Sequence, residues 1–245
     1  MFQFVSFTFK VLSLFDILSA EEIIRLAEDR LKGTTSYAEV TVTTVRPKYT
    51  RDMRIKTWTK GQDYSVTLVI SPAKEKGTVF LRRKNEIWNY VPSIDMLVKM
   101  PPSMLSQSWM GTDIKNDDLL ENSSFINDYN KEIIGNALVE GFDCYKIELT
   151  PKAGVNSIWG KLLLWISKED FLQMRVQYFD QDLELVNTFN GKEVADINGL
   201  LLPSINEVIP EDKLNQMTKL TTTDRSVNIE LNDRIFTTQY MKRLK

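Results

Sequence analysis

Histidine is absent from this 245-residue sequence, and cysteine occurs once, at Cys144. These absences exclude Ser-His-Asp and Cys-His catalysis, metal sites built from histidine or clustered cysteine, and an intrachain disulfide. Lys and Arg number 31 against 33 Asp and Glu, so no basic excess is available to neutralise phosphates. We therefore expect no nucleic-acid partner, no metal and no cofactor, and we predict a binding protein rather than an enzyme. Cys144 is expected to be a small buried hydrophobe.

Long hydrophobic runs are also scarce. The segment from Phe2 to Leu18 is rich in Phe, Val, Leu and Ile, but Lys10 and Asp16 interrupt it. The uninterrupted part is far shorter than the roughly 20 apolar residues of a membrane-spanning helix. We interpret residues 1–19 as a degenerate export signal, with a native N-terminal helix as the alternative. Residues 20–245 are predicted to form a single domain.

One helix is predicted near the start of that domain, from Ala20 to Lys32. Apolar residues at Ile23, Ile24, Ala27 and Leu31 form one stripe at helical spacing, and Gly33 stands where a C-terminal cap belongs. One face of this helix is therefore expected to be buried.

From Tyr37 onward the hydrophobic period changes to two, which indicates antiparallel β-structure. About ten or eleven strands are expected, without the long helices that parallel crossovers require. The predicted fold class is mainly β, a half-open antiparallel barrel formed by one curled sheet. The later strands are expected at Phe142–Thr150, Ile158–Ser167, Leu172–Phe179, Leu185–Gly191, Leu200–Ile209 and Met217–Thr223.

Two hairpins give testable registers. A two-residue turn at Gly61-Gln62 places Ile55 opposite Leu68, and a turn at Lys84-Asn85 places Leu81 opposite Trp88. In each hairpin the apolar residues then share one face. We expect that face to line the concave interior, and a slip of one residue would reverse it. The residues predicted to point inward are Met53, Ile55, Val66, Leu68, Val79, Leu81, Trp88 and Tyr90.

The strand pattern is interrupted between Pro101 and about Asn127. Ser103 is a plausible helix cap and Gly111 can end a turn, so a short helix is expected there. Methionines cluster in or beside this insertion, and their flexible thioethers suit a surface that adapts to variable apolar ligands. The alternative is that the helix only plugs the barrel as core. On the first interpretation, Met96, Met100, Met104 and Trp109 form a mobile lip of the interior cavity.

Eight segments of the sequence carry a resemblance to a known family: residues 76–83, 87–92, 100–104, 108–113, 165–167, 178–180, 198–199 and 202–203. The Trp-Met-Gly segment within residues 108–113 is the most distinctive of them. Together they resemble the outer-membrane lipoprotein-sorting family, relatives of the periplasmic carrier LolA, over about Ala20 to Lys245.

The resemblance implies helices over the concave face of a half-barrel and a hydrophobic cavity that holds acyl chains of lipids or lipoproteins. It also implies a periplasmic location, transport toward the outer membrane, and as partners an inner-membrane transporter, RND-type or lipoprotein-releasing, and an outer-membrane acceptor. The alternative is an accessory subunit of an RND-type exporter with a filled interior. A hydrolase that uses carboxylates ranks last. An empty apolar cavity would favour the carrier, and a convergent pair of buried carboxylates would revive the hydrolase.

Overall fold

The computed structural model describes residues 18–84, 86–116, 125–155 and 157–244. Nearly all of the predicted export signal therefore lies outside the described residues. Helix α1 (Ala20–Lys32) has the predicted bounds. Its first turn is closed by a capping box, in which Glu22 N donates to Ser19 Oγ at 3.3 Å and Ser19 N donates to Glu22 Oε2 at 2.8 Å.

The chain leaves α1 through Gly33, which has a φ of 52°. A Cβ atom at this position would lie 2.4 Å from Asn228 Oδ1. Glycine is therefore required both by the backbone conformation and by the close approach of Asn228.

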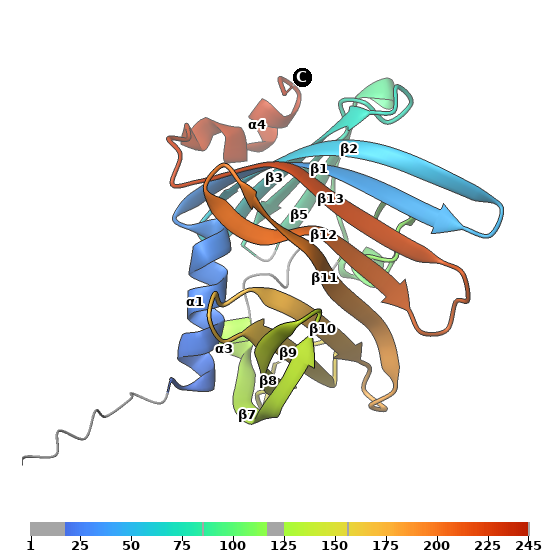
Figure 1. The fold of residues 1–245 in the computed structure, drawn as a ribbon. Coiled ribbons are helices and arrows are strands. Elements are labelled where there is room, and N and C mark those ends of the chain that lie inside the picture. The colour runs from blue at the N-terminus through green and yellow to red at the C-terminus, as the bar shows by residue number, and fades with distance from the viewer. Residues whose placement is uncertain (1–17, 85, 117–124, 156, 245) are drawn as a thin grey trace, which may run out of the picture.

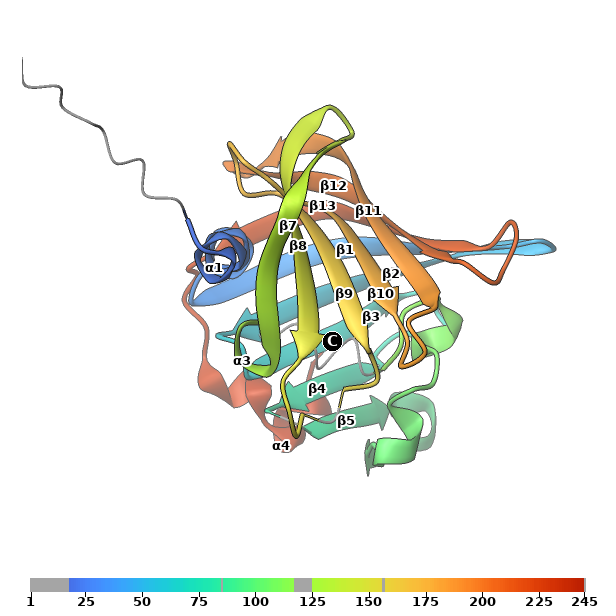
Figure 2. The same cartoon turned by 90° about the horizontal axis from the view of Figure 1, so that it is seen from below.

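The rest of the fold is one antiparallel sheet, and its thirteen strands are ordered β6-β5-β4-β3-β2-β1-β13-β12-β11-β10-β9-β8-β7. Pairing of β1 with β13 joins the N-terminal and C-terminal halves, and β6 and β7 are the two edges. The sheet curls but does not close (Figures 1 and 2). The strands are β1 (Thr35–Arg46), β2 (Tyr49–Lys60), β3 (Tyr64–Ser71), β4 (Val79–Arg83), β5 (Glu86–Val91), β6 (Met96–Lys99), β7 (Tyr129–Val139), β8 (Phe142–Pro151), β9 (Lys161–Ser167), β10 (Gln173–Phe179), β11 (Leu185–Ile197), β12 (Leu200–Pro210) and β13 (Met217–Val227).

Helix α1 lies along one side of the curled sheet, beside the strands of both halves (Figure 1). Its apolar stripe, including Ile23, Ile24 and Ala27, packs in one buried cluster with Leu162 and Leu164 of β9. The amphipathic pattern of the helix is thus satisfied by the inner face of the β7–β10 half.

The chain ends on the outside of the other half. After β13 it forms a 3₁₀ turn η4 (Asp233–Phe236) and helix α4 (Thr238–Met241). Phe236 and Met241 are buried against Val66, Leu68 and residues of β4. This C-terminal segment covers an apolar outer face that the β3–β5 region would otherwise expose to water.

The first predicted hairpin register is wrong by one residue. The loop between β2 and β3 contains three residues, so Lys60 pairs with Tyr64 and Ile55 pairs with Val69 rather than with Leu68. Gly61, with a φ of 53°, begins this longer loop. The second register is correct, because Leu81 does pair with Trp88.

The insertion after β6 differs from the predicted single helix. Its described residues up to Asn116 contain two separate 3₁₀ turns, η2 (Pro102–Met104) and η3 (Trp109–Gly111). Another such turn, η1 (Pro92–Ile94), lies before β6. Met110 has a φ of 51°, which breaks the helical path that the sequence predicts. Helix α3 (Phe125–Asp128) leads into β7. Residues 117–124 lie outside the described part of the chain.

A search of the described helices finds no segment with the length and hydrophobicity to cross a bilayer.

Candidate functional site

A cavity of about 400 Å³ lies on the concave face of the sheet. Its walls come from β1 to β5, from β10, β11 and β13, from the C-terminal end of α1, and from the loop that carries Trp109. The lining is largely apolar, and its apolar and aromatic side chains are Leu31, Val40, Ile55, Phe80, Ile87, Trp109, Ile114, Phe125, Tyr178, Phe189 and Leu220.

One end of the cavity is polar, and strand register explains why. Ser36 of β1 lies opposite Thr59 of β2, and Thr59 lies opposite Ser65 of β3. Ser65 in turn lies opposite Arg82 of β4. Residues that are directly opposite in antiparallel strands share a face, so these side chains form one transverse row on the concave side. The Ser36 and Thr59 hydroxyl oxygens are 2.5 Å apart.

Polarity falls along the strands away from this row. Two residues further along β2, Thr57 lies opposite Thr67, and their hydroxyl oxygens are 3.1 Å apart. Two residues further again, Ile55 lies opposite Val40 on one side and Val69 on the other. The cavity therefore has a polar end and an apolar end.

The Trp109 side chain closes part of the apolar end. It is 2% exposed and meets Phe80 edge to face, with ring centroids 5.7 Å apart. Below it lie Val42, Met53 and Val69 in the same buried cluster. Trp109 therefore packs as core and also lines the cavity, while the mobility of a lip stays a prediction.

Arginines of the sheet anchor the loop that carries Trp109. Arg46 Nη1 lies 2.9 Å from Asp113 Oδ2, and Arg46 Nη2 donates to the Gly111 carbonyl at 3.0 Å. Arg51 Nη2 donates to the Met110 carbonyl at 2.5 Å, and Thr218 Oγ1 donates to Asp113 Oδ2 at 2.7 Å. This network ties the loop to β1, β2 and β13.

Three cationic residues line the polar end: Lys32, Arg82 and Arg225. Burial lowers the pKa of each of them from its ordinary value. For Lys32, the nearby Glu28 carboxylate opposes that effect, while the charges of Arg82 and Arg225 add to it. The polar end thus carries concentrated positive charge in partly desolvated surroundings.

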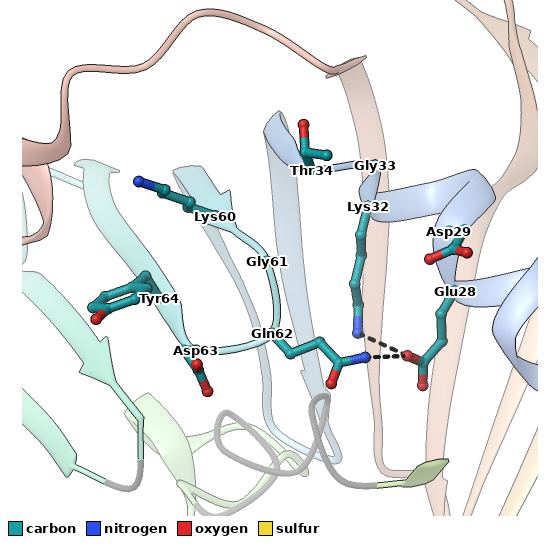
Figure 3. Close-up of a pocket in the computed structure, with 10 residues that line it drawn as sticks. All are labelled: Glu28, Asp29, Lys32, Gly33, Thr34, Lys60, Gly61, Gln62, Asp63 and Tyr64. Atoms are coloured by element: carbon teal, nitrogen blue, oxygen red, sulfur yellow. Dashed lines mark hydrogen bonds and ion pairs between the residues drawn. The ribbon is translucent and has the colours of Figure 1, made fainter. Parts of the chain in front are cut away.

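A surface groove of about 450 Å³ adjoins the polar end, since Lys32 and Gly61 line both. Figure 3 shows this groove between the end of α1 and the β2–β3 loop. Glu28 occupies its wall, 4.0 Å from Lys32 Nζ and 3.2 Å from Gln62 Nε2, which donates to it. Burial raises the pKa of Glu28. The polar end therefore lies next to solvent.

The structure brings two of the twelve predicted cavity residues to the lining, Ile55 and Trp109. Met53 lies on the same face of β2, but it is buried beneath Trp109. These three residues agree with the predicted inward direction.

Six other predicted residues point the opposite way. Trp58 lies between the cavity residues Thr57 and Thr59 on β2 and therefore points to the outer face. Val66 pairs with Trp58, so it points to the outer face as well. The prediction that this group lines the interior is therefore corrected. In the first hairpin the one-residue slip in register reversed the predicted face of β3. In the second hairpin the predicted register was correct, but the face of β4 and β5 that carries the predicted residues is the outer one, which the C-terminal segment covers. The six are Val66, Leu68, Val79, Leu81, Trp88 and Tyr90.

The three remaining predicted residues are not among the described residues that line the cavity: Met96, Met100 and Met104. Met96 and Met104 are exposed, at 43% and 38%. Of the described methionines in or beside the insertion, Met110, the neighbour of Trp109, is the one that packs against the Trp109 cluster. The predicted lip of several methionines around Trp109 is therefore not formed by these three side chains.

Sequence reasoning missed the polar end of the cavity. Its signal is the alternation of hydroxyl residues at Thr57 and Thr59 and at Ser65 and Thr67. With a three-residue loop these hydroxyls fall opposite one another, and Arg82 joins the same row. Because the prediction assigned the more apolar face of each strand to the interior, it placed these hydroxyl residues on the outside.

A family model whose description reads "Uncharacterized protein" matches residues 61–243, about three quarters of the chain. No curated protein matches the sequence. The solved structures therefore provide the remaining comparison.

Three solved structures are similar over nearly their whole length. A DUF1329 family protein from Desulfovibrio piger has a TM-score of 0.81 and 23% identity, with 91% of this chain and 98% of that chain covered. A LolA superfamily protein from Nitrosomonas europaea has a TM-score of 0.76 and 23% identity, covering 91% and 99%. A protein described as an outer-membrane lipoprotein-sorting domain, from Vibrio parahaemolyticus, has a TM-score of 0.79 and 20% identity, covering 91% and 98%. The predicted LolA-like fold is confirmed.

Proposed function

This chain belongs to the family whose model matches residues 61–243 and has the LolA-like fold, and on this basis we propose that it is a carrier that binds acyl chains in its concave cavity. The cargo is the acyl part of a lipid or lipoprotein, and the carrier works in the periplasm and moves its cargo toward the outer membrane. An inner-membrane transporter loads it and an outer-membrane acceptor unloads it. Binding, rather than catalysis, is the proposed activity.

The observation that carries this proposal is the cavity itself. A space of about 400 Å³ lies against Ile55, Phe80 and Trp109, within the size range of small-molecule sites. An accessory exporter subunit with a filled interior has no need of such a space. The unfilled cavity therefore favours the carrier over that alternative.

Transfer energetics also support the carrier. Each methylene removed from water contributes about 0.8 kcal/mol, so a chain of about a dozen contributes roughly 10 kcal/mol before the entropic costs of association. The contacts around Val40, Ile55 and Leu220 supply a suitable apolar surface. Chains of different length can bind without a specific anchor at the apolar end.

A filling substitution tests the proposal. Thr57 lines the cavity on β2, whereas Thr50 is exposed on the same strand. Thr57→Trp places an indole in the cavity, and Thr50→Trp places one in solvent. We expect Thr57→Trp to weaken binding of a fluorescent fatty acid at least about tenfold, which corresponds to about 1.4 kcal/mol.

The control is Thr50→Trp, which should bind the probe as wild type does. Thermal unfolding of both variants reports whether the fold is retained. Saturable binding that is unchanged in folded Thr57→Trp protein would contradict the assignment of the cavity as the acyl site, and the absence of saturable binding to wild type would contradict the carrier function.

A further inference from the structure

Arg225 is a half-buried cation at the polar end of the cavity, and its contacts among the described residues do not include a carboxylate. Its Nη2 donates to the Leu31 carbonyl at the end of α1 and lies 3.5 Å from Ser36 Oγ. None of the ion pairs among the described residues includes Arg225, and its Nε is buried without a hydrogen-bond partner. A buried charge without a counter-ion is costly, so such groups are usually paired when the protein is in its working state.

The residues around Arg225 are further hydrogen-bond donors. Ser36, Thr59 and Ser65 form the row of hydroxyls that leads across the sheet to Arg82. The Arg82 guanidinium donates to the Gln62 carbonyl and is 6% exposed. Guanidinium and hydroxyl groups in this arrangement are the donors that bind carboxylate or phosphate oxygens.

The described lining of the cavity includes three cations and no carboxylate, whereas Glu28, Asp29 and Asp63 line the adjoining groove. Glu28 is the ion-pair partner of Lys32, at 4.0 Å. Asp63 is exposed at the β2–β3 loop and interacts with Arg82 through its charge. Asp29 also acts on Lys32 through its charge. The groove carboxylates therefore offset Lys32 and Arg82, and Arg225 is the cation that none of the described carboxylates pairs with.

We propose that the polar end of the cavity recognises an anionic head group, so that the ligand is an amphiphile with a carboxylate or phosphate at one end. The head group lies against Arg225 and the hydroxyl row, and the chain extends toward Ile55 and Trp109. The groove at Lys32 and Gly61 places this end beside solvent, where a larger head group can extend. This inference rests on the proposed function and specifies its substrate class.

The test compares amphiphiles that share one chain and differ in the head group. Dodecanoate, dodecyl phosphate and dodecanol each displace a fluorescent fatty acid from the full chain at neutral pH. We expect wild type to bind at least one of the two anions about tenfold or more tightly than dodecanol, the size of effect that a hydrogen bond to a charged group produces. The ratio between the anions shows whether carboxylate or phosphate is preferred.

Charge is then removed at the site and at a matched position. Arg225→Met and Arg82→Met keep an apolar stem but remove the guanidinium. Arg83→Met makes the same change on the next residue of β4, which is exposed on the other face. We expect the anion preference to fall to about threefold or less in the first two variants and to stay at the wild-type value in Arg83→Met.

Each outcome is decisive. An anion preference that persists in both Arg225→Met and Arg82→Met, with dodecanol binding intact, would overturn the head-group assignment. Equal binding of all three amphiphiles by wild type would also overturn it, but would leave the carrier proposal in place. Failure of every amphiphile to bind wild type would overturn both proposals together. Because Arg225 also holds the Leu31 carbonyl, its variant is checked by thermal unfolding. If Arg225→Met does not fold, Arg82→Met and the charge-conserving Arg225→Lys are compared instead. Arg225→Lys should keep the anion preference, and Arg82→Met should lose it. Any other result in these two variants would overturn the head-group assignment.

Discussion

At the scale of single residues, Cys144 illustrates how burial controls reactivity. It is fully buried in a small cluster on the outer face with Leu163, Trp165 and Met174. Burial raises the pKa of its thiol to about 11. The thiolate is the reactive form, so we expect folded protein at pH 8 to react with a maleimide far more slowly than protein unfolded in urea.

The raised pKa of Cys144 also makes the stability of the protein depend on pH. Since the folded-state pKa lies above the ordinary thiol pKa of 9.0, the thiol's contribution to the unfolding free energy is complete below pH 9.0 and is lost as the pH rises toward about 11. A Cys144→Ala variant lacks this contribution and serves as the control. Rapid labelling of folded wild-type protein would show that Cys144 is accessible, contrary to this account.

Asp113 carries a second residue-scale prediction. Its side chain is 2% exposed and pairs with Arg46, whose side chain is 13% exposed. Removing one partner of a buried ion pair leaves the other charge uncompensated, so we expect Asp113→Ala to lower the unfolding free energy by about 3–5 kcal/mol in urea denaturation. The control is Asp233→Ala, which removes the 70% exposed partner of Lys60 and should cost about 1 kcal/mol or less. Equal losses would show that the Arg46–Asp113 pair does not anchor the Trp109 loop.

At the scale of elements, the C-terminal segment is predicted to stabilise the fold without taking part in binding. Phe236 is buried against the outer face, with its ring centroid 5.8 Å from that of Tyr64. Phe236→Ala should therefore lower the unfolding free energy by about 3–5 kcal/mol, as buried aromatic truncations do. The cavity lies on the other side of the sheet, so fatty-acid affinity of the folded variant should stay unchanged.

A surface truncation provides the comparison for Phe236. Leu214, at the β12–β13 loop, is 86% exposed, and Leu214→Ala should change stability by less than about 0.5 kcal/mol. Loss of fatty-acid binding in stable, folded Phe236→Ala protein would mean that the outer cluster contributes to the binding site.

The elements also show where sequence reasoning succeeds. Helix α1 was predicted at its observed bounds because the signals that define it are local, namely the apolar stripe and Gly33. The strands from Phe142 on begin within about three residues of their predicted starts, since alternation and turn residues are local too, but β11 and β13 extend past the predicted ends Gly191 and Thr223, to Ile197 and Val227. The edge strand β6 and the strand β7 were not singled out. The weak alternation of β6, which has only four residues, gives little signal.

The faces of the strands could not be predicted in the same way. Strands β2 and β3 carry apolar residues on both faces, because the outer face is covered by Phe236 and Met241 from the far end of the sequence. Only that long-range contact distinguishes a core face from a cavity face. The length of the loop at Gly61 matters as well, since loops of two and of three residues place the side chains of β3 on opposite faces of the sheet.

At the scale of the whole molecule, the open sheet explains how a cavity and a folded core coexist. The β7–β10 half fills its inner face with α1, whereas the β1–β5 half packs its outer face against the C-terminal segment. The inner face of the β1–β5 half is thus only partly covered, by Trp109 and its loop. The space that remains is the proposed acyl site.

Photo-crosslinking can show whether a fatty acid binds in the concave cavity. A hexadecanoic acid with a diazirine on its chain is bound to the full protein and irradiated, and mass spectrometry locates the modified residues. We expect adducts on concave residues such as Thr57, Phe80 and Phe189, suppressed by excess unlabelled fatty acid. Adducts that are confined to outer-face residues such as Val66 and Leu81, or that excess fatty acid does not suppress, would contradict the assignment of the cavity as the acyl site.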